Sequence, residues 1–227
     1  MKVASALFGC ALALACAAPV PAQVTTKASK SLLRIKWVKG KSYKYSINFA
    51  MVIPGSSKVM NNPMSLKMDV TDSKAGVGTV RYSLSGAQGV DDKPQTVKMD
   101  ARGKTVGAGG LSDLFIQLPA NPVAVGQSWT VEQPTSNSMF GKAAITMKLT
   151  FRGVKTVGGK KVAEMNVNTS LKGKATSGKG QGVLYISPDD GMVSSMDQML
   201  NIETKTTDSK GKTQTSEVPI KITMTLQ

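Results

Sequence analysis

Apolar and polar residues alternate along most of the 227-residue chain, and this period of two constrains the fold more than any other feature. Every second residue from Tyr43 to Ile53 is apolar, whereas Lys44, Ser46 and Asn48 lie between them. Such a period places successive side chains on opposite faces of a β-strand, one face buried and the other in water. No window of the sequence shows a long helical repeat, so the alternation predicts an all-β protein.

About ten segments of this kind follow one another with short links, a pattern typical of an antiparallel meander. We expect one curved sheet, or a half or full barrel, with a β-sandwich as the alternative. The Asp-Asp-Gly sequence at 189–191 is predicted to form a tight turn. The glycine- and lysine-rich stretch 172–182 is predicted to be a loop or a ragged strand end. Pro219 stands near the start of the last strand, so that strand is expected at an edge of the sheet.

The stretch from Gly110 to Trp129 interrupts the alternation. A short apolar patch at 111–118 is followed by two prolines, and proline disfavours the helical conformation in the residue before it. We therefore expect one short helix or loop near 111–118. The rest of the pattern predicts a single β-rich domain over 32–227, with two halves that are hinged at 110–129.

The N-terminus has the composition of an export signal. Lys2 is followed by an apolar run rich in alanine and leucine, and small residues precede Ala22. The run is shorter than the roughly 20 residues that span a bilayer. A lipid on Cys16 is the alternative, but the residues before it fit a lipoprotein signal poorly. We expect a signal peptide at 1–22, a flexible tether at 23–31, and an exported chain, periplasmic or extracellular, without a transmembrane segment.

The chain contains no histidine, and both of its cysteines lie within the predicted signal. The absence of histidine removes the commonest general base and most zinc, copper(II) and iron ligand sets. Without cysteine the mature chain has neither a disulfide nor a thiolate nucleophile. The acidic residues fall mostly in turns or on the polar faces of strands, and the pattern places no pair of carboxylates in a pocket. We therefore expect a non-catalytic protein with no metal and no cofactor.

The chain is strongly basic, with 29 lysines and arginines against 14 acidic residues and a formal net charge of +15. Nearly all of the excess is lysine, a solvated point charge, whereas arginine is the usual reader of phosphates and bases. The few aromatic residues do not interleave with basic ones as nucleic-acid stacking platforms would, so a nucleic-acid partner is not expected. Two interpretations stay open: a lysine-coated soluble surface, or attraction to an anionic envelope component such as acidic lipid or polysaccharide.

Methionines fall repeatedly on the inward positions of the predicted strands, where they would fill a core that has few aromatic residues. The alternative is a pliable surface for a lipid-like ligand, because methionine adapts to irregular shapes. In that case the concave face of the sheet would bind an apolar or amphipathic envelope molecule, and apolar residues of 111–129 would plug or gate it. The predicted ligand-binding residues are Tyr45, Phe49, Met68, Leu114, Phe115, Trp129, Met147 and Phe151.

Three short motifs stand out against the alternating background. One is the segment Pro119–Trp129, which follows the pattern PxxPVxVGxSW. Another is Leu33–Gly40 followed by Tyr43 and Tyr45, and the last is Gly182–Gly191, with a tyrosine and a serine inside it. Together they resemble an uncharacterised bacterial family of exported, often lipid-anchored, β-rich proteins. The resemblance implies export and a curved antiparallel sheet, and it transfers no catalytic residue.

Overall fold

The computed structural model describes residues 24–27, 30–52, 58–86, 93–107, 116–137, 141–207 and 213–227. Every regular element within these ranges is a β-strand, which confirms the all-β prediction. The strands are β1 (Val24–Lys27), β2 (Lys30–Leu33), β3 (Ser42–Val52), β4 (Val59–Lys74), β5 (Val77–Ser85), β6 (Gln95–Met99), β7 (Val123–Ala124), β8 (Ser128–Asn137), β9 (Gly141–Val157), β10 (Lys160–Gly173), β11 (Thr176–Ile186), β12 (Val193–Thr207) and β13 (Thr213–Leu226).

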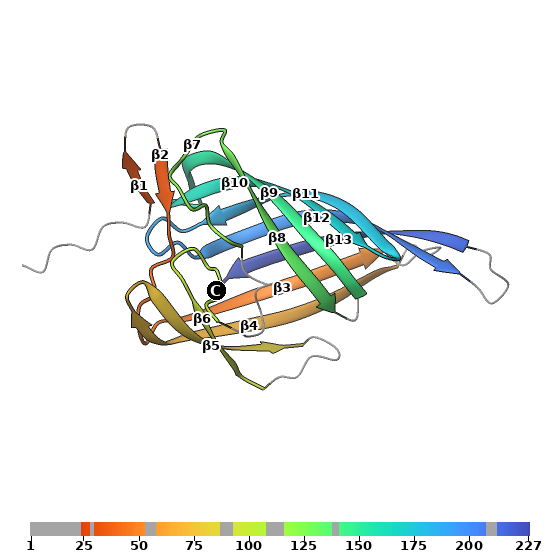
Figure 1. The fold of residues 1–227 in the computed structure, drawn as a ribbon, viewed down its shortest axis with the longest axis horizontal. Coiled ribbons are helices and arrows are strands. Elements are labelled where there is room, and N and C mark those ends of the chain that lie inside the picture. Colours follow the sequence, from red (N-terminus) through yellow and green to blue (C-terminus); the bar gives the residue numbers. More distant parts are fainter. Residues whose placement is uncertain are drawn as a thin grey trace, which may run out of the picture.

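Ten of the strands form one antiparallel sheet in the order β6-β5-β4-β3-β13-β12-β11-β10-β9-β8. Figure 1 shows this sheet curling, with its edge strand β8 crossing in front of strands from the middle. The two end strands, β6 and β8, do not pair with each other, so the sheet stays open. The predicted curved meander is confirmed, whereas the full barrel and the β-sandwich are not the architecture that the chain adopts.

The last strand, β13, joins the two sequence halves. It pairs with β3 from Ile220, opposite Met51, to Leu226, opposite Tyr45, and it pairs with β12 on its other side. The expectation that this strand lies at an edge is therefore wrong. Pro219 is tolerated because the pairing with β3 begins one residue later, so its missing N–H leaves no gap in that ladder.

The strands alternate between buried and exposed residues as the sequence predicts. Along β3, Tyr43, Tyr45 and Ile47 are buried, whereas Lys44 and Ser46 are exposed. We call the side of the sheet that carries the buried residues the core face, and the side that carries the exposed residues the outer face. The largest fully buried side chains of the core are Phe151, Leu33, Met68, Met99, Leu118, Leu149, Met165, Leu184 and Ile186.

The core face is covered by segments that lie outside the large sheet. The small sheet β1-β2-β7 contributes Leu33 and Val123 to the main buried cluster, and the following segment contributes Trp37. Trp37 lies directly on Gly78 of β5, where an added Cβ would come within 2.4 Å of the indole ring. Its indole N–H donates to the carbonyl of Asp100 at 3.0 Å, so the ring is fixed at both ends.

The described part of 110–129 begins at Ile116 and lies against the core face. Residues 116–119 form no helix, and 111–115, where the rest of the short helix or loop was expected, lie outside the described residues. Arg34 donates to the carbonyls of Pro119 and Ala120, at 2.7 and 2.6 Å. Arg102 donates from Nε to the carbonyl of Leu118 at 3.0 Å. Two of the few arginines therefore hold this segment in place.

The stretch 172–182, predicted as a loop or a ragged strand end, is mostly regular strand, because β10 continues to Gly173 and β11 begins at Thr176. A Cβ added to Gly180 would lie 2.3 Å from Cδ2 of Leu200 on β12. The glycines of this strand thus mark close packing and not a turn. All of them fall on the core face: Gly178, Gly180 and Gly182.

The predicted turn at 189–191 is confirmed, and it packs into the molecule. The N–H of Gly191 donates to the carbonyl of Ser187 at 2.9 Å, and the N–H of Lys36 donates to the carbonyl of Asp190 at 2.8 Å. Gly191 has a φ of +71°, in the left-handed region that favours glycine. This turn therefore anchors the β11–β12 hairpin to the segment that follows β2.

Candidate functional site

The residues predicted to bind an apolar ligand belong mostly to the core. Three of them are almost fully buried in the main cluster: Tyr45, Met68 and Phe151. Three more are partly buried against that cluster: Phe49, Trp129 and Met147. Leu114 and Phe115 lie outside the described residues. The structure thus brings six of the predicted residues together in one apolar cluster, and ligand binding there stays a prediction.

The described residues form a hollow of about 520 Å³ in a different place, on the outer face of strands β9 to β12. It is open to solvent, and most of its lining side chains are polar and uncharged. The lining residues are Thr146, Lys148, Asn168, Thr169, Ser170, Lys179, Gly180, Gln181, Met199 and Asn201. We call this feature the outer hollow.

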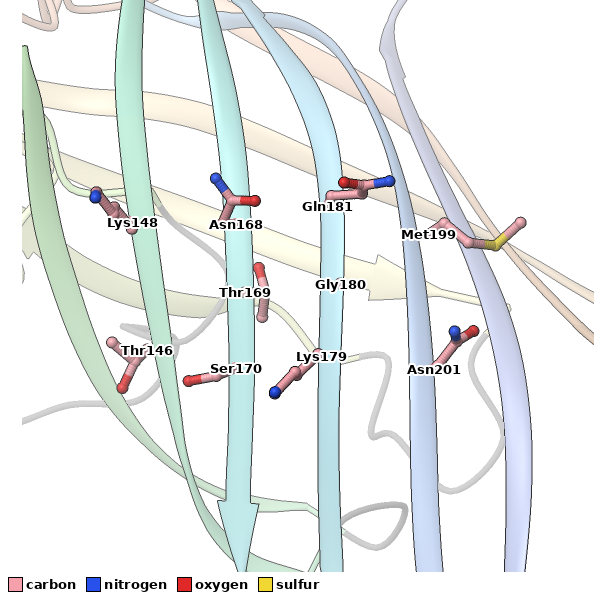
Figure 2. A pocket seen from close by; sticks show the side chains of 10 residues that line it. All are labelled: Thr146, Lys148, Asn168, Thr169, Ser170, Lys179, Gly180, Gln181, Met199 and Asn201. Carbon is pink, nitrogen blue, oxygen red and sulfur yellow. The ribbon is translucent and has the colours of Figure 1, made fainter.

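Strand register arranges the lining side chains in two rows that run across the strands. The upper row contains the cross-strand partners Lys148, Asn168, Gln181 and Met199. The lower row contains the partners Thr146, Ser170, Lys179 and Asn201. Figure 2 shows the two rows, each with one side chain from β9, β10, β11 and β12. A ligand in the outer hollow therefore meets four strands at once.

The same alternation that builds the core positions these side chains. Lys148 is exposed because its neighbour Leu149 is buried, and Asn168 is exposed because Val167 and Thr169 are buried. The hydroxyl of Thr169 accepts a hydrogen bond from Nε2 of Gln198 on β12. This buried bond joins β12 to β10 across β11, where glycines leave room for it, on the core side of the hollow. The floor of the outer hollow is thus fixed from the core side.

Lys148 and Lys179 supply the charge of the outer hollow. Both are exposed, and within the described ranges neither has a carboxylate partner at ion-pair distance. Two strand spacings and an offset of two residues place their Cα atoms about 12 Å apart. The remaining polar groups are hydroxyls and amides, which both donate and accept hydrogen bonds. None of the lining residues is a carboxylate. The site is therefore suited to a hydroxyl-rich ligand that carries negative charge.

Ionisable groups with shifted pKa values lie elsewhere, around the 189–191 turn. Burial alone would raise the pKa of Asp190, but its bonds with Lys41, the backbone of Met192 and Ser187 outweigh burial and lower it. Lys41 Nζ lies 2.8 Å from the Asp190 carboxylate. Burial raises the pKa of Tyr43, and the adjacent charge of Asp190 raises it further. Every member of this group has a protein partner, so we interpret the group as a structural junction.

A second apolar cluster lies at the other end of the core face. Its buried members are Leu171, Leu200, Ile202 and Ile220. Several apolar side chains around it are only partly buried: Phe49, Met51, Ala143, Ile145, Val218 and Ile222. Phe49 packs against both clusters, so it marks the boundary between the filled core and this half-covered apolar surface.

Sequence reasoning did not identify Lys148 and its neighbours as a site. The hollow depends on the register of four strands, and the residues of one strand alone carry no sign of that register. The only available signal was the run of amides and hydroxyls at alternate positions, such as Asn166, Asn168 and Ser170 on β10. Among the described residues, no group of three or more acidic residues is placed to hold a metal ion.

Comparison with known proteins gives structural likenesses and no family. No protein-family model matches the chain, and no curated protein is significantly similar to it. Among solved structures, the chain resembles a protein from Bacteroides fragilis that is described as inferred to be exported and as having a YmcC-like fold. The two share 12% identity with a TM-score of 0.42, over 82% of this chain and 96% of the other. Within the described ranges, no helix has the length and apolar character needed to cross a membrane.

Proposed function

We propose that the protein is an exported, non-catalytic binding protein that holds an acidic polysaccharide of the cell envelope in the outer hollow. The observation that carries this proposal is the lining itself. It combines two lysines that have no carboxylate partner among the described residues with hydroxyl and amide side chains on a four-stranded surface. Export is supported by the signal-like N-terminus. The absence of a carboxylate from the lining favours binding over bond cleavage.

The chemistry of the lining favours a polysaccharide over other anionic partners. Asparagine, glutamine, serine and threonine side chains match the alternating donors and acceptors of sugar hydroxyls. Lysine supplies charge without the planar fork with which arginine reads phosphates and bases. Met199 is the only large apolar side chain in the lining, and it is too small an anchor for a lipid surface. A glycan with carboxylate groups matches both the hydroxyl and amide side chains and the lysine charge of the site.

A binding experiment tests the proposal directly. We expect the purified protein to bind polygalacturonate, and not neutral dextran, and to lose affinity as salt approaches about 0.15 M, where charges are screened beyond roughly 8 Å. The double substitution Lys148→Gln and Lys179→Gln should weaken binding by about tenfold, because exposed ion pairs contribute up to about 1 kcal/mol each. The matched control is Lys98→Gln with Lys104→Gln, an equal charge change near the opposite edge of the sheet. Equal losses in both double variants would contradict a specific site.

Binding of an apolar or amphipathic molecule on the core face is the second candidate. It is favoured by the half-covered apolar surface around Phe49, Met51 and Ile145. Native mass spectrometry after gentle purification tests it, because a bound lipid would add mass to the chain. A protein that is free of ligand, and that does not take up fatty acid when it is offered, would exclude this candidate.

A further inference from the structure

The upper row of the outer hollow continues beyond the hollow onto β13. Met199, the last member of the row, is the cross-strand partner of Lys221. Lys221 is about half exposed, at 49%, and it is not part of the lining. The next partners along the row are Ala50 on β3 and Asn61 on β4, a small side chain and an amide. The row of cross-strand partners thus continues on the outer face from Lys148 across β13.

The strand spacing gives the distance between the lysines along this row. Four strand spacings separate Lys148 on β9 from Lys221 on β13, which places their Cα atoms about 19 Å apart. Lys179 lies between them in the neighbouring row. A ligand that is confined to the hollow reaches only β12, so contact with Lys221 requires a chain that leaves the hollow.

Lys221 is engaged in an ion pair that a ligand can replace. Its ammonium lies 3.1 Å from the carboxylate of Asp197, and Asp197 is 63% exposed. Exposed pairs of this kind contribute little stability, because water and salt screen both charges. Exchange of the Asp197 carboxylate for an acidic group of a ligand therefore costs little. Between the two ends, the 49% exposed side chain of Met199 offers an apolar contact for the face of a sugar ring.

We infer that the ligand is a linear acidic polysaccharide that crosses the strands from β9 to β13, and that Lys221 binds an acidic group outside the outer hollow. This inference rests on the proposed function and adds chain length and direction to it. It predicts an extended site with two parts. The outer hollow holds a short stretch of the chain, and Lys221 adds affinity only for chains that are long enough to reach it.

The test uses a size series of oligogalacturonates with the full mature protein. Affinity should rise with chain length beyond the fragment that fills the hollow. Lys221→Gln should remove this rise, an effect of about 2- to 5-fold on long chains, and leave short fragments unchanged. Asp197→Asn should raise affinity for long chains by a similar factor, because it frees Lys221. Lys98→Gln serves as the control for lost charge, and circular dichroism verifies that each variant is folded.

The outcomes separate this inference from the function on which it rests. If short fragments bind in a manner that depends on Lys148, but Lys221→Gln and Asp197→Asn change no affinity at any length, the extended site is wrong and the proposed function stands. If no oligogalacturonate or polygalacturonate binds, both are wrong. Opposite effects of the two substitutions, confined to long chains, support the extended site.

Discussion

Gly191 occupies a position where a side chain would meet the backbone of another segment. A Cβ at this position would lie 1.9 Å from the carbonyl oxygen of Arg34 and 2.8 Å from the Cα of Ile35. Its φ of +71° adds a second requirement for glycine. The β11–β12 turn and the segment after β2 can therefore approach each other this closely only because residue 191 is a glycine.

We expect Gly191→Ala to destabilise the protein by at least about 3 kcal/mol, because a backbone clash adds to the strain of a left-handed residue. The matched control is Gly76→Ala, since Gly76 has a φ of +77° but no atom within 4 Å of its Cβ position. That control should cost about 1–2 kcal/mol. Urea unfolding measures both, and equal costs would show that the clash with Arg34 does not matter.

Asp190 next to Gly191 makes the junction sensitive to acid. Its pKa is lowered in the folded state from the ordinary value of 3.8. Its stabilising effect is therefore complete above that value and is lost as the pH falls through the lower pKa of the folded protein. Asp190→Asn should cost about 1–3 kcal/mol at neutral pH, because charged hydrogen bonds from Lys41 and the turn are weakened.

The measurement compares urea unfolding of the wild type and Asp190→Asn over a pH series. The difference between them should shrink below about pH 4, because the Asp190 carboxyl of the unfolded chain takes up its proton there before that of the folded protein does. Asp72→Asn, which removes a carboxylate that is 58% exposed, should differ little from the wild type at every pH. A constant difference between wild type and Asp190→Asn down to the lowest pH would contradict the role of the charge.

At the scale of the element, β11 shows why local composition misleads. Its glycines predicted a loop, yet they alternate with Ser177, Lys179 and Gln181 in a regular strand. The period of two was present, but glycine has no side chain from which burial can be recognised. The neighbouring strand explains them, because residues of β12 fill the space that side chains on β11 would need.

A graded series of alanine substitutions tests this packing. An added Cβ would lie 2.3 Å from the carbonyl of Asp197 at Gly182, and 2.9 Å from that of Asn201 at Gly178. Gly182→Ala should therefore destabilise by about 1–3 kcal/mol, and Gly178→Ala by less. Thermal or urea unfolding gives the order. A larger loss for Gly178→Ala than for Gly182→Ala would show that these contacts do not govern the cost.

The fold was more predictable from the sequence than the site. Strands such as β3 and β9 expose their period of two directly, so their faces follow from the residues alone. The position of β13 does not, because its partner β3 lies far away in the sequence, and Pro219 suggested an edge. The outer hollow is harder still, since it needs the register of four strands and its residues have the ordinary composition of a wet strand face.

At the scale of the whole molecule, the pairing of β3 with β13 makes one sheet from two sequence halves. The prediction of halves that are hinged at 110–129 would allow each half to unfold separately. Direct pairing from Ile220 to Leu226 joins a strand of the second half to a strand of the first, and the hinge stays a prediction. The chain contains two tryptophans, and they report on different halves: Trp37 lies on β5, and Trp129 belongs to β8.

We expect the two halves to unfold in one cooperative transition. In each single-tryptophan variant, Trp37→Phe and Trp129→Phe, the midpoint of the fluorescence change in urea should coincide with the midpoint from far-ultraviolet circular dichroism. The comparison is made within each variant, so that a loss of stability from the substitution does not affect it. Fluorescence midpoints that depart from the circular dichroism midpoint in opposite directions would indicate independent halves.

The most direct test of the proposed binding site is nuclear magnetic resonance titration of the isotopically labelled protein with an oligogalacturonate. We expect the largest shift changes at the backbone and side-chain amides of Asn168, Gln181 and Asn201, on the outer face. Saturable changes that are confined to Phe49 and Ile145 on the core face, or no saturable changes at all, would contradict the outer hollow as the site.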